Sequence, residues 1–152
     1  MNTPHHFSSS HLGEFSKSLQ HRLAEPLPGL KTQLKMVPSP RPGHRIYSEV
    51  RDTCIEAGVL ILFYPAGNDI SLVLTRRNEK MKIHQAQISF PGGRRENAET
   101  LEQAALREAE EELGIPAERA RILGVLTPLY IPPSNYCIFP FTAVLDSRPC
   151  FR

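Results

Sequence analysis

The sequence predicts an α+β domain in which one long helix lies between two groups of strands. The chain has 152 residues, which is enough for one domain with its own core and too few for two ordinary domains. The apolar run AGVLILFYP at 57–65 has the composition of a buried strand and is too short to span a bilayer. Residues 101–113 place apolar side chains at helical spacing, and two more apolar runs follow them.

The N-terminal part predicts a short helix followed by a proline-rich arm. Apolar residues recur there at spacings of three and four: Leu12, Phe15, Leu19 and Leu23. This spacing is typical of an amphipathic helix. Residues 26–43 are rich in proline, so we expect an extended arm that cannot join a central sheet. We therefore divide the chain into a helix and Pro-rich arm at 1–45 and a main domain at 46–152.

The strands of the main domain are predicted from five segments. Residues 55–65 and 70–77 flank the turn signal AGND, so they are expected to form a hairpin. Residues 86–93, AQISFPGG, predict a short strand that ends in a Pro-Gly-Gly bend. Residues 120–131 and 136–145 are two further apolar strands, which PPSN connects.

The helix at 101–113 has clear signals at both ends. Thr100 is a predicted N-cap, and Gln103 follows three residues later as its capping-box partner. Gly114 stands where a helix often ends in the left-handed conformation. One stripe of the helix is apolar and must face the core, with Leu106 at its edge: Leu101, Ala105, Ala109 and Leu113.

Charge is distributed in two blocks, although the net charge is only +2. Among their charged side chains, residues 76–95 have six basic groups and one acid, and residues 96–112 have seven Glu and one Arg. Basic groups suit phosphate oxygens, and clustered carboxylates suit hard cations. The alternative is that both blocks are solvated faces. No basic helix with interleaved aromatic residues is present, so neither nucleic acid nor a membrane is expected as a partner.

The acidic block is unfavourable for the helix that carries it. Glu108 is followed by Glu111 and Glu112 at spacings of three and four, which puts like charges on neighbouring positions. Negative charge near the C-terminal end also opposes the helix dipole. A divalent cation with oxygen ligands would compensate both effects. The pattern therefore favours a metal site on this helix.

The spacing of these residues resembles the Nudix box, the signature of the Nudix hydrolases. The box begins at Gly93 and runs through Glu99 to Ile115. Its remaining matched positions are Arg107, Glu108, Ala109, Glu111, Glu112 and Gly114. Ala109 stands where a larger aliphatic residue is usual. The resemblance implies a Nudix-type α/β/α sandwich with a mixed β-sheet.

The segment LTRRNEKMKIHQAQISFPGG is similar to the additional signature of the coenzyme A diphosphatase subgroup. Its spacing holds from Leu74 to Gly93. Lys82 stands where that signature has Arg, and Ala86 where it has Gly. Lys keeps the charge and lacks the planar fork with which Arg grips a phosphate.

The resemblance implies roles for individual residues. Glu108, Glu111 and Glu112 are expected to bind Mg²⁺ or Mn²⁺, with the carbonyl of Gly93 as a further ligand. One of the three Glu, with Glu111 as a candidate, would be the general base. Arg107 is expected to pair with Glu99, and so to orient the metal-binding side chains.

Substrate contacts are expected from the basic block. Arg77, Lys82 and His84 are the candidate phosphate-binding residues, with a solvated surface position as the alternative for the last two. The partner is then a small nucleotide substrate. Many Nudix domains are dimers and the Pro-rich arm would reach a second copy, so a homodimer is expected by analogy.

The most specific function that follows is metal-dependent hydrolysis of coenzyme A or acyl-coenzyme A to phosphopantetheine, or its acyl form, and 3′,5′-ADP. Two alternatives stay open at this stage. One is a Nudix diphosphatase of ADP-ribose, dinucleoside polyphosphates or oxidised nucleotides. The other is an inactive Nudix domain that binds a ligand.

Two further expectations concern the cysteines and the C-terminal end. Cys54, Cys137 and Cys150 are far apart and form no CxxC pattern, so we expect reduced thiols in a cytoplasmic protein. Nudix domains usually continue with another strand or two and a helix, whereas only DSRPCFR follows Leu145. We therefore expect the C-terminal part of the domain to be truncated.

Overall fold

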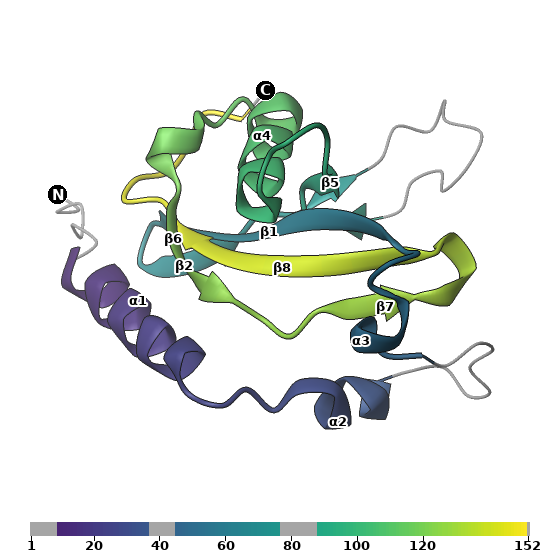
Figure 1. Cartoon of the computed structure of the whole chain (residues 1–152). Helices are drawn as coiled ribbons and strands as arrows, with labels where there is room; N and C mark the ends of the chain where they lie inside the picture. Colours follow the sequence, from purple (N-terminus) through teal and green to yellow (C-terminus); the bar gives the residue numbers. More distant parts are fainter. Residues whose placement is uncertain (1–8, 37–44, 77–87, 152) are drawn as a thin grey trace, which may run out of the picture.

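The computed structural model describes residues 9–36, 45–76 and 88–151, and in them a mixed β-sheet lies between helices (Figure 1). The helices are α1 (Ser9–Ala24), α2 (Gly29–Gln33), α3 (Tyr47–Val50) and α4 (Leu101–Leu113), with 3₁₀ turns at Leu34–Met36, Ala117–Arg119 and Pro132–Ser134. The strands are β1 (Ile55–Ala66), β2 (Asp69–Leu72), β3 (Thr75–Arg76), β4 (Ile88–Ser89), β5 (Gly92–Arg94), β6 (Arg121–Val125), β7 (Leu129–Ile131) and β8 (Tyr136–Val144).

The main sheet is organised around the long strands β1 and β8. They run parallel, with registered pairs from Ile55↔Tyr136 to Phe63↔Val144. The order across the sheet is β2-β1-β8-β6, and β5 and β7 pair with β1 and β8 respectively. A parallel pair needs a crossover connection, which here contains α4. Strands β3 and β4 form a separate antiparallel pair.

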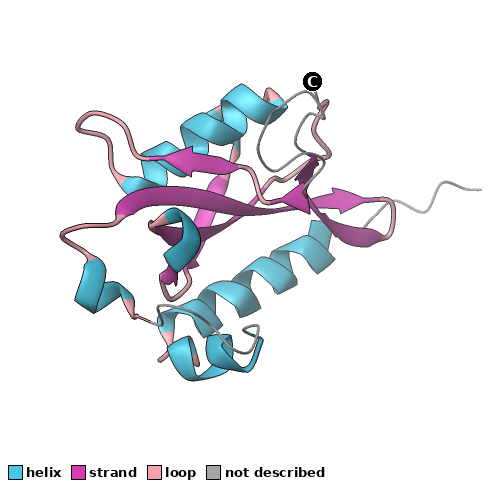
Figure 2. Ribbon diagram, turned by 90° about the vertical axis from the view of Figure 1, so that its right-hand side faces the viewer, coloured by secondary structure: helices cyan, strands magenta, loops and turns pink. Residues whose placement is uncertain are grey.

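Helices α4 and α1 cover opposite faces of the main sheet, as Figure 2 also shows. On the α4 side the buried core is Leu60, Leu62, Val73, Ala105, Ala109, Leu113, Ile115, Ala120, Ala143 and Leu145. On the α1 side Leu12 packs with Leu123 and Val144, and the rings of Phe15 and Phe63 meet edge to face at 5.0 Å. This arrangement confirms the predicted α+β class and the mixed sheet between helices. No described helix is long and apolar enough to cross a membrane.

The long helix and most strands lie where the sequence predicts them, but the predicted Pro-Gly-Gly bend contributes to strand β5, and two predicted strands are each divided. The predicted strand at 70–77 separates into β2 and β3, because β3 pairs with β4 and not with β1. The predicted strand at 120–131 separates into β6 and β7, which pair with opposite ends of β8. Apolar runs alone do not show where a strand changes its neighbour.

Part of the proline-rich arm is helical, which corrects the expectation of an extended arm. Residues 29–36 form α2 and a 3₁₀ turn. The side-chain amide of Gln33 donates a hydrogen bond of 2.9 Å to the carbonyl of Thr127, just before β7. Gly29 supplies a positive φ of 58° where the chain enters this helix. This part of the arm is therefore helical and also contacts the main domain through Gln33.

Two cysteines are joined, so the expectation of three reduced thiols was wrong. Cys54 and Cys137 form a disulfide, with Cα atoms 5.9 Å apart and a sequence separation of 83 residues. Cys54 directly precedes β1, and Cys137 is the second residue of β8. The parallel pairing of these strands brings the two side chains together, which no sequence spacing reveals. Cys150 is a free, exposed thiol.

Candidate metal centre on helix α4

Helix α4 begins and ends as its sequence predicts. The Thr100 hydroxyl accepts a hydrogen bond of 3.1 Å from the Gln103 backbone, and the Gln103 side chain accepts one of 2.8 Å from the Thr100 backbone. At the other end Gly114 has φ 70° and donates its N–H to the Glu110 carbonyl at 2.9 Å. Each end therefore satisfies backbone groups that a helix leaves free, which sets the rotational position of the acidic residues between them.

Small residues let α4 lie very close to β1. A Cβ placed on Gly58 would stand 2.2 Å from the Leu101 carbonyl oxygen and 2.9 Å from the Ala105 nitrogen. Ala105 and Ala109 are buried on the helix side of this contact, as is Ala104, which the predicted stripe does not include. The close approach brings the acidic face of α4 beside β5, the strand that pairs with β1.

Glu108 lies directly against the backbone of Gly93. Gly93 is the middle residue of β5 and pairs with Gly58 of β1. A Cβ on Gly93 would stand 2.3 Å from Oε1 of Glu108, so any side chain at this position would displace the carboxylate. The Glu108 side chain is 19% exposed. The structure thus brings together two residues that the sequence predicts as metal ligands.

Arg107 connects this contact to two other acids. Its Nη1 lies 3.0 Å from Glu108 Oε1 and 3.2 Å from Glu111 Oε1. Its Nη2 and Nε donate to the two carboxylate oxygens of Glu99 at 3.0 and 3.2 Å, which is the expected bidentate pair. Nη2 also donates to the Arg94 carbonyl at 3.1 Å. One guanidinium therefore holds the loop, Glu99 and two candidate ligands in a fixed relation.

The contact between Arg107 and Glu99 shifts the pKa values of both groups, downward for Glu99 and upward for Arg107. The hydrogen bond from Arg107, followed by one from the Glu96 backbone, lowers the pKa of Glu99 below its ordinary value. The hydrogen bond with Glu99 is the largest cause that raises the pKa of Arg107, although burial opposes it. Both groups are therefore charged at neutral pH.

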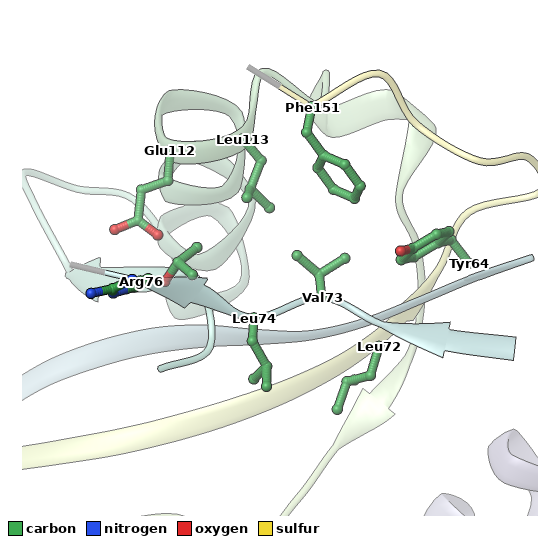
Figure 3. Close-up of a pocket in the computed structure, with 9 residues that line it drawn as sticks. Tyr64, Leu72, Val73, Leu74, Arg76, Glu112, Leu113 and Phe151 are labelled. Carbon is green, nitrogen blue, oxygen red and sulfur yellow. The ribbon is translucent and has the colours of Figure 1, made fainter. Parts of the chain in front are cut away.

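Glu112 is the third predicted acidic ligand. It lines a cavity of about 370 Å³ between α4 and the strand segment 72–76, together with Leu113, Val73 and Phe151. Figure 3 shows Glu112 and Arg76 at one side of this cavity and Tyr64 at the other. Phe151 and Tyr64 meet edge to face, with ring centroids 5.6 Å apart. The cavity thus has an apolar wall and, on the α4 side, an acidic residue.

The donor chemistry of the centre fits a hard divalent cation, although the three acids do not all converge. Glu108 and Glu111 direct oxygens at the same cationic atom of Arg107, so both carboxylates are aligned toward one positive charge. Carboxylate and carbonyl oxygens are the ligands that Mg²⁺ and Mn²⁺ take. Among the described residues, no three His, Cys, Asp or Glu side chains are grouped closely enough to hold an ion together.

The predicted substrate-binding residues Arg77, Lys82 and His84 lie outside the described residues. Sequence reasoning overlooked a second polar contact beside the centre, in which Arg95 and Glu56 form an ion pair of 2.6 Å. The only sequence signal for it was a charged residue at the start of a strand that is otherwise apolar.

Known proteins share both sequence and fold with this chain. The model of the NUDIX domain family matches residues 55–148. Two proteins described as uncharacterized Nudix hydrolase NudL are similar in sequence. The one from Pectobacterium atrosepticum is 39% identical over 100 residues, covering 64% of this chain and 46% of that protein. The one from Klebsiella aerogenes is 49% identical over 59 residues, covering 38% and 49%. The chain thus spans about half the length of these relatives.

Solved structures show the same fold. A Nudix hydrolase from M. smegmatis, RenU, superposes with a TM-score of 0.50 at 26% identity, covering 62% of this chain and 63% of the other. The Ap4A hydrolase of C. elegans gives 0.51 at 22% identity, covering 64% and 69%. The NUDIX domain of Shewanella oneidensis NrtR, crystallised with ADP ribose, gives 0.52 at 16% identity, covering 71% and 75%. With the family match over residues 55–148, the chain belongs to the Nudix hydrolase family.

Proposed function

We propose that the chain hydrolyses a nucleoside diphosphate linked to a second group, in a reaction that depends on Mg²⁺ or Mn²⁺. The observation that carries the proposal is the contact of Glu108 with the Gly93 backbone, next to the guanidinium that Glu108 shares with Glu111. The contact joins the first residue of the Nudix motif to its acidic helix. It supplies oxygen donors from a strand and a helix at one place.

The residues of the motif then have distinct tasks. Glu108, Glu111 and Glu112 provide carboxylates for the cation, and Gly93 provides a carbonyl. A divalent cation held by these residues would lower the pKa of a bound water and would neutralise charge on the diphosphate. Arg107 holds its neighbours in place through Glu99 and the loop backbone. The general base is one of the three Glu, and the choice among them stays a prediction.

Coenzyme A and its acyl derivatives are the substrates that we propose first. One water adds to the diphosphate, one phosphoanhydride bond breaks, and the products are phosphopantetheine, or its acyl form, and 3′,5′-ADP. The support is the segment from Leu74 to Gly93, which is similar to the coenzyme A diphosphatase signature. Phosphate contacts from Arg77, Lys82 and His84 belong to the same proposal.

A second substrate class is kept because Lys82 and Ala86 differ from that signature. It comprises ADP-ribose, dinucleoside polyphosphates and oxidised nucleotides. The Ap4A hydrolase and the ADP-ribose complex among the solved structures share the fold at 22% and 16% identity, so they support the fold and not a particular substrate. An inactive domain that binds a ligand is the remaining alternative.

The test is a product assay with Mg²⁺ and a panel of coenzyme A, acetyl-coenzyme A, ADP-ribose, NADH and diadenosine polyphosphates, read by mass spectrometry. The variants are Glu108→Gln and the double variant Glu111→Gln/Glu112→Gln. Glu110→Gln is the matched control, because it removes an exposed carboxylate of the same helix that is outside the motif.

Release of 3′,5′-ADP from coenzyme A, lost in both motif variants and kept in the control, would support the first substrate class. Turnover of another panel member alone would select the second class. If the folded protein turned over no panel member, hydrolysis would be contradicted and the inactive domain would stand. Equal activity of Glu108→Gln and the unchanged protein would contradict the roles given to the acids.

A cytoplasmic location is part of the proposal, because the substrates are small nucleotides. The Cys54–Cys137 disulfide argues against this location, since such bonds are rare in cytosolic proteins. Cell fractionation tests it: recovery of the protein outside the cytoplasmic fraction would contradict the location. The homodimer stays a prediction.

A further inference from the structure

A second ion pair lies beside the candidate metal centre, at the start of β1. Glu56 is the second residue of this strand, and its side chain is 17% exposed. Its Oε2 lies 2.6 Å from Nη2 of Arg95, and its Oε1 accepts a hydrogen bond of 3.1 Å from the Tyr47 hydroxyl. Donors from two separate segments therefore hold the two oxygens of one carboxylate, which restrains its orientation.

The Tyr47 side chain is in turn held by a contact with β8. Its ring meets that of Phe139 of β8 edge to face, with centroids 5.0 Å apart and an angle of 84° between the rings. Burial is the first cause that raises the pKa of Tyr47, and the hydrogen bond with Glu56 is the second. The hydroxyl thus remains a donor at neutral pH. Tyr47 therefore holds one carboxylate oxygen of Glu56, and Arg95 pairs with the other.

Arg95 is held through both its backbone and its side chain. Its N–H donates to the Glu56 carbonyl at 2.9 Å, which extends the pairing of β5 with β1 by one step past the Ala57↔Arg94 pair. The side-chain contact with Glu56 closes a second link between the same two residues. We call this double link the clasp. The backbone just after Gly93 is consequently fixed to the main sheet.

The clasp is one residue away from the network of Arg107. The carbonyl of Arg94 accepts a hydrogen bond of 3.1 Å from Arg107 Nη2. Since Arg95 follows in sequence, the clasp restrains the peptide that carries this carbonyl. The same guanidinium reaches Glu108 and Glu111 through its Nη1. A continuous set of contacts therefore runs from β1 to two candidate metal ligands.

We propose that Glu56 and Arg95 are positioning residues of the metal centre: their clasp fixes the loop after Gly93, and through Arg107 it sets the orientation of Glu108 and Glu111. Neither residue touches the substrate or the cation. The inference rests on the proposed function, because it gives the clasp its role at that same centre. Hydrogen-bond partners that orient metal ligands change metal affinity by about 10- to 100-fold when they are removed. The clasp acts one link further out, so loosening it should weaken metal binding by about three- to tenfold.

The test measures Mn²⁺ binding directly, by electron paramagnetic resonance of free Mn²⁺, with no substrate present. Glu56→Gln keeps the shape and the acceptor for Tyr47 but removes the charge. Arg95→Met removes the donors, and Arg95→Lys restores charge without the planar group. Arg119→Gln is the control, because this exposed Arg follows α4 in sequence and its side chain donates to Ser147, which is not part of the clasp or of the Arg107 network. Thermal unfolding shows which variants are folded.

We expect Kd for Mn²⁺ to rise by about three- to tenfold in Glu56→Gln and Arg95→Met, by less in Arg95→Lys, and not at all in the control. The metal concentration that gives half-maximal activity should rise in parallel, while kcat at saturating metal changes little. If Arg95→Met does not fold, Glu56→Gln and Arg95→Lys decide the question.

Unchanged Mn²⁺ binding in folded Glu56→Gln and Arg95→Lys would overturn the inference and leave the proposed function intact. A different result would overturn both: an unaltered protein that neither binds Mn²⁺ nor hydrolyses any member of the substrate panel. A rise in Kd that was equally large in Arg119→Gln would also contradict the inference, because it would show a general loss of stability.

Discussion

At the residue scale, the candidate metal centre depends on close contacts that leave no room for larger side chains. The Glu108 carboxylate lies where a Cβ of residue 93 would stand, so any residue other than Gly at this position would displace the carboxylate. Arg107 is shared among three carboxylates, of which Glu99 accepts two of its hydrogen bonds. The sequence predicted the pairing of Arg107 with Glu99 by resemblance. For the clasp, the sequence showed a charged residue at the start of an apolar strand but not its partner Arg95, since the pairing depends on the position of β5 beside β1.

The substitution Gly93→Ala should weaken Mn²⁺ binding by at least about tenfold, because the added Cβ displaces a candidate ligand. Metal titration of the folded variant checks this. Gly13→Ala is the control, since a Cβ at Gly13 meets nothing within 4 Å. Normal metal binding by Gly93→Ala would contradict the assignment of Glu108 as a ligand.

Acid should remove the contribution of Glu99 to stability. Its pKa is lower in the folded protein than in the unfolded chain, because Arg107 donates to it. The contribution is therefore present above the ordinary Glu pKa of about 4.3 and is lost as the pH falls through the lowered value. We expect Glu99→Gln to be less stable than the unaltered protein at neutral pH, and the difference to shrink below about pH 4.

Denaturant unfolding at several pH values, with Glu110→Gln as a second carboxylate variant, measures this difference. A difference between Glu99→Gln and the unaltered protein that stayed constant down to strong acid would show that the pair with Arg107 does not depend on the charge of Glu99.

At the scale of elements, the position of α4 on β1 decides where the acids lie. Gly58 and the buried alanines of α4 allow backbone contact between helix and strand. The ends of the helix follow from local hydrogen bonds at Thr100 and Gly114, which explains why the sequence predicted its bounds well. The strands were predicted less well. Whether 70–77 stays one strand depends on which partner each half finds.

Gly58→Ala should reduce the free energy of unfolding by about 1–3 kcal/mol, because its Cβ would overlap the Leu101 carbonyl oxygen unless α4 moves outward. Denaturant unfolding gives the value. The movement of α4 should also weaken Mn²⁺ binding, since it separates Glu108 from Gly93. A loss of stability without any change in Mn²⁺ binding would show that the centre tolerates such a shift.

At the scale of the whole molecule, the sheet has a helix layer on each face. Helix α1, which lies outside the matched family region, covers the face opposite α4 with Leu12, Leu19 and Leu23. The disulfide joins the start of β1 to β8, at the end of the sheet where Glu56 stands in register with Cys137. These features hold together parts of the chain that are distant in sequence.

Replacing both bonded cysteines, Cys54→Ala/Cys137→Ala, should lower the free energy of unfolding by about 2–4 kcal/mol, because the bond restricts a long loop of the unfolded chain. Unfolding of the oxidised protein, with Cys150→Ala as the control, measures the difference. If the double variant matched the oxidised protein in stability, the bond would contribute nothing in solution.

The sequence by itself determined the bounds of α4, its apolar stripe, the long strands β1 and β8, and the spacing of the motif. These features depend on hydrogen bonds and side-chain periodicity within a few residues of the chain. Only the tertiary structure decided that Cys54 bonds to Cys137, that Glu112 lines a cavity beside the strand segment 72–76, and that Arg95 is held by Glu56. Each of these contacts depends on which elements become neighbours in the fold. Residues that are far apart in the sequence meet there, and their sequence separation does not predict their distance in space.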